Sequence, residues 1–409
     1  MNILLLCDRV PDSASDGLLL RVLALARELA PRHTIDVLCL RARAGTQSVA
    51  PGIFRRVWMA APGASRPPPG PLGPLVGWGP EVLYVPSPEV TALLETEIHP
   101  ADYDVVWDAG AVLMTQLPQR WQAVPVVADL VDDMVLTFQR AMRAAPRWLD
   151  KLRHWKYAHI FGRFERESMR RAAHCVVVSS EDAASFARVS PQVPVSVVAN
   201  GVDTDHFAPD GTATEPGRLV FEGTMGFPPN EQAALHLVRD IMPRIWAVRP
   251  ETTLALVGRA PGPAVRALAS ERVSVTGAVA DVRQHVLRAE VFVCPLVSGA
   301  GIKNKLLQAW AMERPVVATS MSIGGLQARD GVDLLVRDGA EAFAGAVVKL
   351  LGDPERRNAL GRAGREVAVS RFAWGAMAAR FEVLLVQAAQ AAQAAQAAQA
   401  ASRQAAPGR

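Results

Sequence analysis

The sequence has few cysteines and no long apolar run, and both features limit what the chain can be. Its cysteines are Cys7, Cys39, Cys175 and Cys294, and each lies in a short apolar run that predicts a buried strand. No pair has the spacing of a metal site, so we expect small buried thiols in a reducing compartment. Without a basic leader or an apolar run of 18 residues, we expect no signal peptide and no membrane span. The expectation is a cytoplasmic protein whose membrane contact, if it has one, is peripheral on the inner face.

The chain also carries little net charge. Its 44 Lys and Arg against 40 Asp and Glu give a formal charge of +4, which is too mild to indicate a nucleic-acid partner. Half of the residues are hydrophobic and 21% are charged, so we expect globular cores rather than disorder. The 409 residues are enough for two domains.

Apolar strands alternate with amphipathic helices in the first half. A strand over Asn2–Cys7, a helix over Leu18–Ala30 and a strand over Thr34–Leu40 are typical of a parallel sheet with helical connections. Further strands are predicted at Val105–Asp108, Val124–Ala128, Cys175–Ser179 and Val195–Val198. A Pro- and Gly-rich stretch, Ala61–Pro80, predicts a surface loop.

A second alternating series fills the other half. Its predicted strands are Leu219–Glu222, Thr253–Val257, Val273–Thr276, Val291–Pro295, Val316–Thr319 and Asp333–Val336. Two such series predict an α/β protein of two Rossmann-like, doubly wound parallel-sheet domains. The predicted divisions are a first domain over 1–199, a linker over 200–217, a second domain over 218–372, a crossover helix over 373–386 and a Gln/Ala tail over 387–409. The tail is expected to form helix but no core.

The turns that follow the strands of the second domain are candidate ligand sites, because ligands in open α/β sheets bind beyond the carboxyl ends of the strands. In the turn Ser298–Gly301, glycine amides can approach an anion closely, and the next helix directs its positive end there. Lys303 and Lys305 add charge, and Gln308 shares a flank with Lys305, where it could bond a ribose diol. The alternative is a plain strand-to-helix turn with solvated lysines.

The run PLVSGAGIKNKLLQA, from Pro295 to Ala309, resembles the donor-site signature of family 4 glycosyltransferases, which are retaining enzymes of the GT-B fold. Asn200–Phe207 resembles their interdomain linker, and Phe221–Met225 with Pro229–Asn230 resembles the start of their donor domain. The sequence also resembles sugar transferases of bacterial exopolysaccharide and exosortase-linked clusters. The likeness covers roughly Asn2 to Trp374 and is strongest from Asn200 onward.

This resemblance implies a hexosyltransferase-like enzyme that moves a sugar from a UDP- or GDP-sugar to a glycan, a lipid-linked or a small-molecule acceptor. The two domains would face a cleft, with retention of anomeric configuration and no cofactor or metal ion. Asp16 and Gly17 are expected on the acceptor side. The expected donor-binding residues are Gly223, Thr224, Gly258, Arg259, Gly277, Val279, Gly299, Ala300, Gly301, Lys303, Lys305 and Gln308.

Two departures from the family pattern keep other functions open. Ala300 and Gln308 stand where the family has two glutamates, and the phosphate-binding Arg and Lys of its first donor loops are missing. A nucleotide-sugar epimerase of the same fold and an inactive nucleotide-binding scaffold are therefore alternatives. A dehydrogenase is not expected, because no Gly-x-Gly-x-x-Gly follows the first strand.

Two features of the first domain also predict contacts with ligands. Asp129, Asp132 and Asp133 follow an apolar strand and could hold an acceptor hydroxyl or take its proton; a metal site or a helix cap are the alternatives. The region Phe138–Ala173 is predicted to be helical, with ten Lys or Arg, three Asp or Glu and interleaved aromatic residues. We expect it to contact anionic or lipid-linked material, the alternative being a solvated face with its aromatics in the core.

Overall fold

The computed structural model describes residues 1–11, 17–41, 49–63, 85–131, 133–145, 147–298 and 303–405. The chain forms two compact units, which we call the first unit (Met1–Val198 with Ala378–Arg409) and the second unit (Ala199–Met377). Of the expected surface loop, residues 64–80 lie outside the described part. Five candidate site residues also lie outside it: Asp16, Asp132, Gly299, Ala300 and Gly301.

The first unit is built on a parallel sheet with the order β3-β2-β1-β4-β5-β6-β7 in the described residues. Its strands are β1 (Asn2–Cys7), β2 (Thr34–Leu40), β3 (Val57–Ala60), β4 (Val105–Ala109), β5 (Val126–Asp129), β6 (His174–Val177) and β7 (Val195–Val197). All residues of β4 and β5 are buried. Both strands are apolar except for one aspartate each, Asp108 near the end of β4 and Asp129 at the end of β5, as expected for strands covered on both faces.

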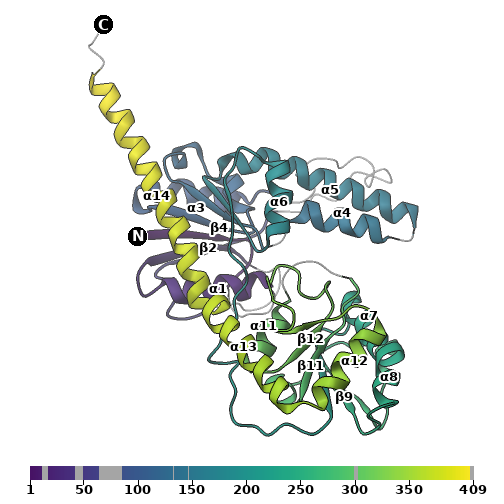
Figure 1. Cartoon of the computed structure of the whole chain (residues 1–409). Helices are drawn as coiled ribbons and strands as arrows, with labels where there is room; N and C mark the ends of the chain where they lie inside the picture. Colours follow the sequence, from purple (N-terminus) through teal and green to yellow (C-terminus); the bar gives the residue numbers. More distant parts are fainter. Residues whose placement is uncertain are drawn as a thin grey trace. The chain divides into compact units, whose positions relative to one another are not determined.

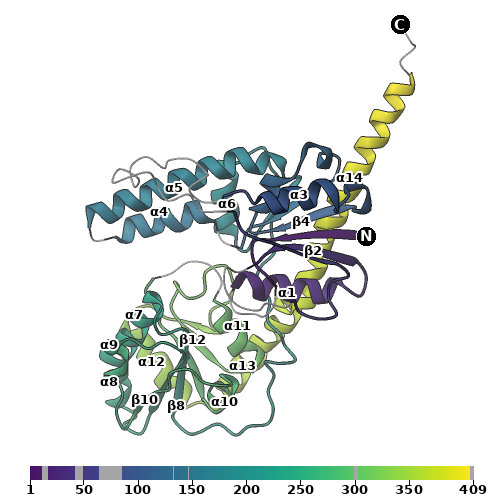
Figure 2. The same cartoon turned by 180° about the vertical axis from the view of Figure 1, so that it is seen from behind.

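Helices connect these strands (Figure 1). They are α1 (Gly17–Leu29), α3 (Pro88–Thr96), α4 (Met134–Ala144), α5 (Trp148–Ser168) and α6 (Ser180–Val189). The basic region that the sequence predicts to be helical forms two helices, α4 and α5, which lie side by side in both views (Figures 1 and 2). The break follows from Pro146, because the residue before a proline avoids the helical conformation, and Ala145 is extended.

The second unit repeats this plan with a parallel sheet in the order β10-β9-β8-β11-β12-β13. Its strands are β8 (Arg218–Glu222), β9 (Thr253–Val257), β10 (Val273–Val275), β11 (Val291–Cys294), β12 (Val316–Ala318) and β13 (Leu335–Val336). Its helices are α7 (Pro228–His236), α8 (Met242–Trp246), α9 (Pro263–Arg266), α10 (Arg283–Leu287), α11 (Asn304–Ala311), α12 (Ala340–Leu351) and α13 (Pro354–Phe372). Two doubly wound parallel sheets confirm the fold class expected from the sequence.

The sequence predicts one helix near Glu231–Ala247 in the second unit, but the structure divides this stretch in two. A π-helical turn, Leu237–Ile241, separates α7 from α8. Pro243 has no N–H to give to the preceding turn, and its ring crowds that turn. The wider π turn accommodates the missing hydrogen bond.

The last helix, α14 (Trp374–Ala405), is continuous through the region where a crossover helix was expected to end and a tail to begin. In the first unit, the buried ring of Phe381 packs against Trp107 with 5.0 Å between ring centroids. Further along, Ala388 and Ala389 are buried, and Gln396 Nε2 donates to the carbonyl of Ala123 over 2.8 Å. The Gln/Ala segment therefore packs on the first unit, with small alanine side chains at the contact.

Candidate active site

The order of the second sheet places a switch point between β8 and β11. From β8 the chain continues to β9 and β10 on one side, whereas β11, β12 and β13 lie on the other. At such a point the connecting helices lie on opposite faces, which opens a crevice at the carboxyl ends of the two strands. The turns that follow β8 and β11 are therefore the strongest candidates for a ligand site.

Three of the expected donor-site glycines are joined at this edge by backbone hydrogen bonds. Gly223 N donates to Val257 O over 2.9 Å, and Gly258 N donates to Gly277 O over 3.2 Å. Only glycine fits at Gly258, which has a φ of +143°, since a Cβ there would lie 1.9 Å from the carbonyl oxygen of Gly223. The turns after β8, β9 and β10 thus form one connected backbone surface.

The ammonium of Lys305, in the first turn of α11, reaches this surface. Its Nζ donates to Asn230 Oδ1 over 2.8 Å and lies 4.6 Å from the centroid of the Phe221 ring. A Cβ on Gly223 would lie 2.5 Å from the same nitrogen, so the ammonium covers the Gly223 backbone. The carboxyl group of Glu222 is close by, where burial raises its pKa and Lys305 partly opposes that rise. A positive charge is therefore held at the switch point.

The remaining expected donor residues have less definite contacts. Arg259 Nε approaches Thr224 Oγ1 at 3.4 Å, at the same edge as Gly223. Lys303 immediately precedes α11, and Gln308 lies about one turn beyond Lys305 and is half-buried. Val279 is half-buried and follows β10 by four residues. The structure thus brings together Gly223, Thr224, Gly258, Arg259, Gly277 and Lys305.

Three residues that support this edge were not predicted as site residues. Phe221 and Asn230 fix the position of the Lys305 ammonium, and the Glu222 carboxyl lies near it. The sequence did contain a signal for all three, because Phe221 and Glu222 fall in the segment Phe221–Met225, and Asn230 in Pro229–Asn230, both of which resemble the family pattern. Nothing in the spacing indicated that Asn230 would contact a lysine 75 residues away.

The first unit has a pocket of about 340 Å³ at the carboxyl ends of β1, β4 and β5. This is also a switch point, because β1 and β4 are neighbours and the later strands extend beyond β4. The lining is mostly apolar, with three ionisable side chains. The residues are Asp8, Arg9, Gly17, Leu18, Gly110, Val112, Leu130, Val131, Met134, Phe161, Phe164, Glu165 and Met169. Gly17 is the one described residue of the expected acceptor-side pair.

The described carboxylates after β5 have structural partners. Asp129 is fully buried, and both its oxygens accept from Arg21 Nε at 3.0 Å, with Arg21 buried as well. Asp133 caps α4, since its Oδ1 accepts from Leu136 N over 2.8 Å. The helix-cap alternative therefore holds for Asp133, and Asp129 does not line the pocket.

Glu165, on α5, is a candidate that the sequence did not indicate. Its side chain lines the pocket but is only 3% exposed. Within the part of the chain that the structure describes, Glu165 Oε2 and Asp133 Oδ2 are buried without hydrogen-bond partners. Burial, helped by the charge of Asp133, raises the pKa of Glu165 to about 8. The sequence signal was an acidic residue beside Phe161 and Phe164, on the apolar flank of a basic helix.

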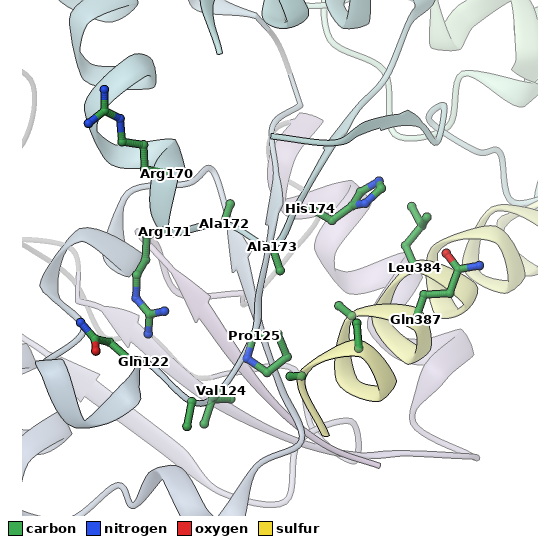
Figure 3. Close-up of a pocket in the computed structure, with 14 residues that line it drawn as sticks. Gln122, Val124, Pro125, Arg170, Arg171, Ala172, Ala173, His174, Leu384 and Gln387 are labelled. Atoms are coloured by element: carbon green, nitrogen blue, oxygen red, sulfur yellow. The ribbon is translucent and has the colours of Figure 1, made fainter. Parts of the chain in front are cut away.

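A second pocket of the first unit, about 490 Å³ in volume, lies at the opposite edge of the sheet (Figure 3). It is lined by residues before β5, such as Pro125, by residues before β6, such as Arg170, and by Leu384 and Gln387 of α14. Because it is at the amino ends of the strands, it is not the candidate active site.

The described residues contain neither a cluster of metal ligands nor a helix that could span a membrane. No group of three or more His, Cys, Asp or Glu side chains could hold a metal ion. None of the described helices has the length and hydropathy needed to cross a bilayer.

Two family profiles match the chain. The profile "Glycosyltransferase Family 4" matches residues 16–206, and "Glycosyl transferases group 1" matches residues 216–353. The chain is 28% identical over 340 residues to a GDP-mannose-dependent alpha-(1-6)-phosphatidylinositol monomannoside mannosyltransferase of Mycolicibacterium smegmatis. The aligned region covers 75% of this chain and 82% of that protein. It is 30% identical over 271 residues to an alpha-maltose-1-phosphate synthase of the same organism, covering 56% of this chain and 68% of that one.

Solved structures share the fold. A sucrose-phosphate synthase from Thermosynechococcus elongatus has a TM-score of 0.66 at 20% identity and covers 95% of this chain and 99% of its own. The Anabaena protein HepE, in complex with UDP and glucose, has a TM-score of 0.63 at 15% identity and covers 94% of this chain and 99% of its own. At these identities the likeness shows the fold alone.

Proposed function

The chain belongs to the family 4-like glycosyltransferases of the GT-B fold, and from this premise we propose that it transfers a sugar from a nucleoside-diphosphate sugar to an acceptor hydroxyl with retention of configuration. The bond between the anomeric carbon and the phosphate oxygen breaks, and the acceptor oxygen bonds to that carbon and loses its proton. The nucleoside diphosphate leaves with the charge that develops on its outer phosphate.

The position of Lys305 is the observation that carries this proposal. A diphosphate at the β8/β11 switch point would meet the Lys305 ammonium, the N-terminal end of α11 and the amide surface around Gly223. These groups are held in place before the reaction, so they would stabilise the departing phosphate without reorganisation. Gly299, Ala300 and Gly301, which lie outside the described residues, belong to the same proposed site, as do the flanking Lys303 and Gln308, with Val279 at its margin.

The acceptor is proposed to occupy the pocket of the first unit. Its apolar walls suit an acceptor with an apolar part, and Glu165 offers a polar atom for a hydroxyl. Asp132 and Asp133 remain proposed acceptor-side residues, as do Asp16 and Gly17. We assign Asp129 to holding Arg21 in place rather than to the chemistry.

A UDP- or GDP-sugar is the proposed donor class. HepE is described with UDP and glucose, and the mycobacterial relative is named as GDP-mannose-dependent. The acceptor class proposed is a glycan, a lipid-linked or a small molecule, in polysaccharide or glycoconjugate synthesis. The replacement of two glutamates by Ala300 and Gln308 favours one rival, a nucleotide-binding scaffold without turnover.

Calorimetric titration with UDP and GDP tests the donor site. Lys305→Ala should weaken diphosphate binding by about tenfold or more, because a charge-assisted hydrogen bond contributes roughly 1.5–3 kcal/mol. The effect should be larger for the diphosphate than for the nucleoside. Lys349→Ala removes an exposed lysine near the end of α12 in the same unit and serves as the matched control.

Two outcomes would contradict the proposal. If Lys305→Ala and Lys349→Ala bind UDP and GDP equally well, the diphosphate does not lie on α11. If the wild-type chain binds nucleoside diphosphates but releases no sugar from any donor in a panel of UDP- and GDP-sugars with and without acceptors, the scaffold alternative replaces the transferase.

A further inference from the structure

The N-terminal half of α5 exposes large apolar side chains. Trp148 is 71% exposed, Leu149 60%, Leu152 51% and Trp155 46%; we call these four residues the Trp148 surface. Trp148 and Trp155 are the two exposed tryptophans among the described residues, and both belong to this surface. Trp148, Leu152 and Trp155 are spaced by four and three residues, so they share one face of the helix. A grouped apolar surface of this kind is typical of a contact site.

The opposite face of α5 packs within the hairpin. Phe138 of α4 stacks on Tyr157 with 5.2 Å between ring centroids and on Phe161 with 5.5 Å. The aromatic residues of the basic region are therefore divided between two environments. Tyr157 and Phe161 pack on Phe138 of α4, whereas Trp148 and Trp155 are largely exposed, and the ring of Trp155 stacks on His159 of its own helix with 5.8 Å between ring centroids. These contacts leave most of the Trp148 surface open to solvent.

Basic side chains surround the Trp148 surface. From Arg147 to Lys156 the sequence has four Lys or Arg and one Asp. Arg147, Lys151 and Arg153 are exposed, and Arg153 pairs with the single acidic residue, Asp150, over 3.2 Å. Further along α5, Arg163 and Arg166 are also exposed. The local charge is thus positive around an apolar centre.

We propose that the Trp148 surface binds the surface of a lipid bilayer that contains anionic lipids. Tryptophan and leucine side chains can enter the boundary between headgroups and acyl chains, while Lys and Arg side chains meet lipid phosphates. A second copy of this chain is a poorer partner, because its own Trp148 surface would bring like charges together. The contact is peripheral, in agreement with the lack of a spanning helix among the described residues.

The same helix links this surface to the pocket of the first unit. Phe161, Phe164 and Glu165, in the second half of α5, line that pocket. If the pocket binds the acceptor, as proposed above, attachment through α5 would hold it near the lipid surface. That consequence rests on the proposed function, whereas bilayer binding itself does not.

Vesicle flotation tests the proposal. The full chain should float with vesicles of phosphatidylcholine and phosphatidylglycerol but not with phosphatidylcholine alone, and high salt should weaken the binding. Trp148→Ser with Trp155→Ser should reduce vesicle binding by about tenfold or more. Lys151→Gln should reduce it about fivefold, since one basic residue near an anionic surface contributes roughly 1 kcal/mol.

Matched controls come from the second unit. Val248→Ser changes a side chain that is 64% exposed, and Lys349→Gln removes an exposed charge; both should bind vesicles like the wild type. Circular dichroism and titration with UDP or GDP should be unchanged in the double tryptophan variant. This separates loss of bilayer binding from misfolding and from failure of the donor-site proposal.

Three results would overturn the proposal. The first is equal flotation of the wild type and the double tryptophan variant. The second is binding that ignores both lipid charge and salt. The third is no flotation with either vesicle, together with a dimer that dissociates when Trp148 and Trp155 are replaced, which would show that a second copy covers this surface.

Discussion

At the carboxyl edge of the second sheet, backbone hydrogen bonds join neighbouring turns and one lysine ammonium lies against them, whereas at the same edge of the first sheet the contacts are between buried side chains. Gly223 and Gly258 connect neighbouring turns through their amides. In the first unit, Arg21 and Asp129 pair, and Glu165 and Asp133 bury unpaired oxygens. A surface of backbone groups suits a ligand part that is the same in every donor, such as a diphosphate. A surface of side chains can differ between related enzymes, because substitutions can fit it to different acceptors.

The largest expected effect tests whether the first edge depends on its buried ion pair. Asp129→Asn removes the buried carboxylate that pairs with Arg21 and should cost about 3–5 kcal/mol of unfolding free energy. Arg163→Gln, which breaks an exposed pair with Glu167 on the same unit, should cost under about 1 kcal/mol. Urea unfolding measures both. Normal stability of Asp129→Asn with lost turnover would return Asp129 to the chemistry.

A smaller effect is expected at the second edge, from a single methyl group. Gly258→Ala should cost about 2–3 kcal/mol, because an alanine at this positive φ is strained and its Cβ meets the Gly223 carbonyl. UDP and GDP binding should weaken with it. Gly345→Ala is the control: it lies within α12 with no neighbour inside 4 Å and should be neutral or slightly stabilising. Equal unfolding midpoints for the two variants would contradict the backbone account.

The strands and the glycine turns that follow them were predictable because their signals are local. Fully apolar strands and the glycine turns that follow them are written in a few adjacent residues. The partners of those turns are not: Asn230 meets Lys305 from far along the chain. Arg21 lies in the apolar sequence of α1, and nothing in the neighbouring residues indicates that it pairs with the buried carboxylate of Asp129. The edge strand β3 was also missed, since it is short and only partly buried.

The last expected effect is a change in the pH dependence of stability at Glu165. The folded chain holds this proton up to a pKa of about 8, whereas the ordinary value is 4.5. The stability that the proton contributes is complete below about pH 4.5 and is lost as the pH rises toward and through about 8, by at most about 1.4 kcal/mol per pH unit. Glu165→Gln should therefore gain stability relative to the wild type across this window.

Chemical unfolding at several pH values measures this difference. Asp108 has a pKa raised to about 8 by burial as well, so only the change between wild type and variant is informative. Glu167→Gln alters an exposed carboxylate on the same helix and should leave the slope unchanged. Parallel slopes for all three proteins would show that Glu165 is ionised in the folded chain.

The division of the first unit between the two ends of the chain affects the order in which the protein matures on the ribosome. Phe381 and Glu382 of α14 complete the unit by packing on Trp107 and by pairing with Arg32 and His33. The whole second unit, residues 199–377, is synthesised before Phe381 and Glu382. During that time the nascent first sheet lacks its last helix, while the second unit can close on its own contiguous segment. Pausing of translation within unit 2 would thus prolong a stage in which chaperones can bind the open first unit.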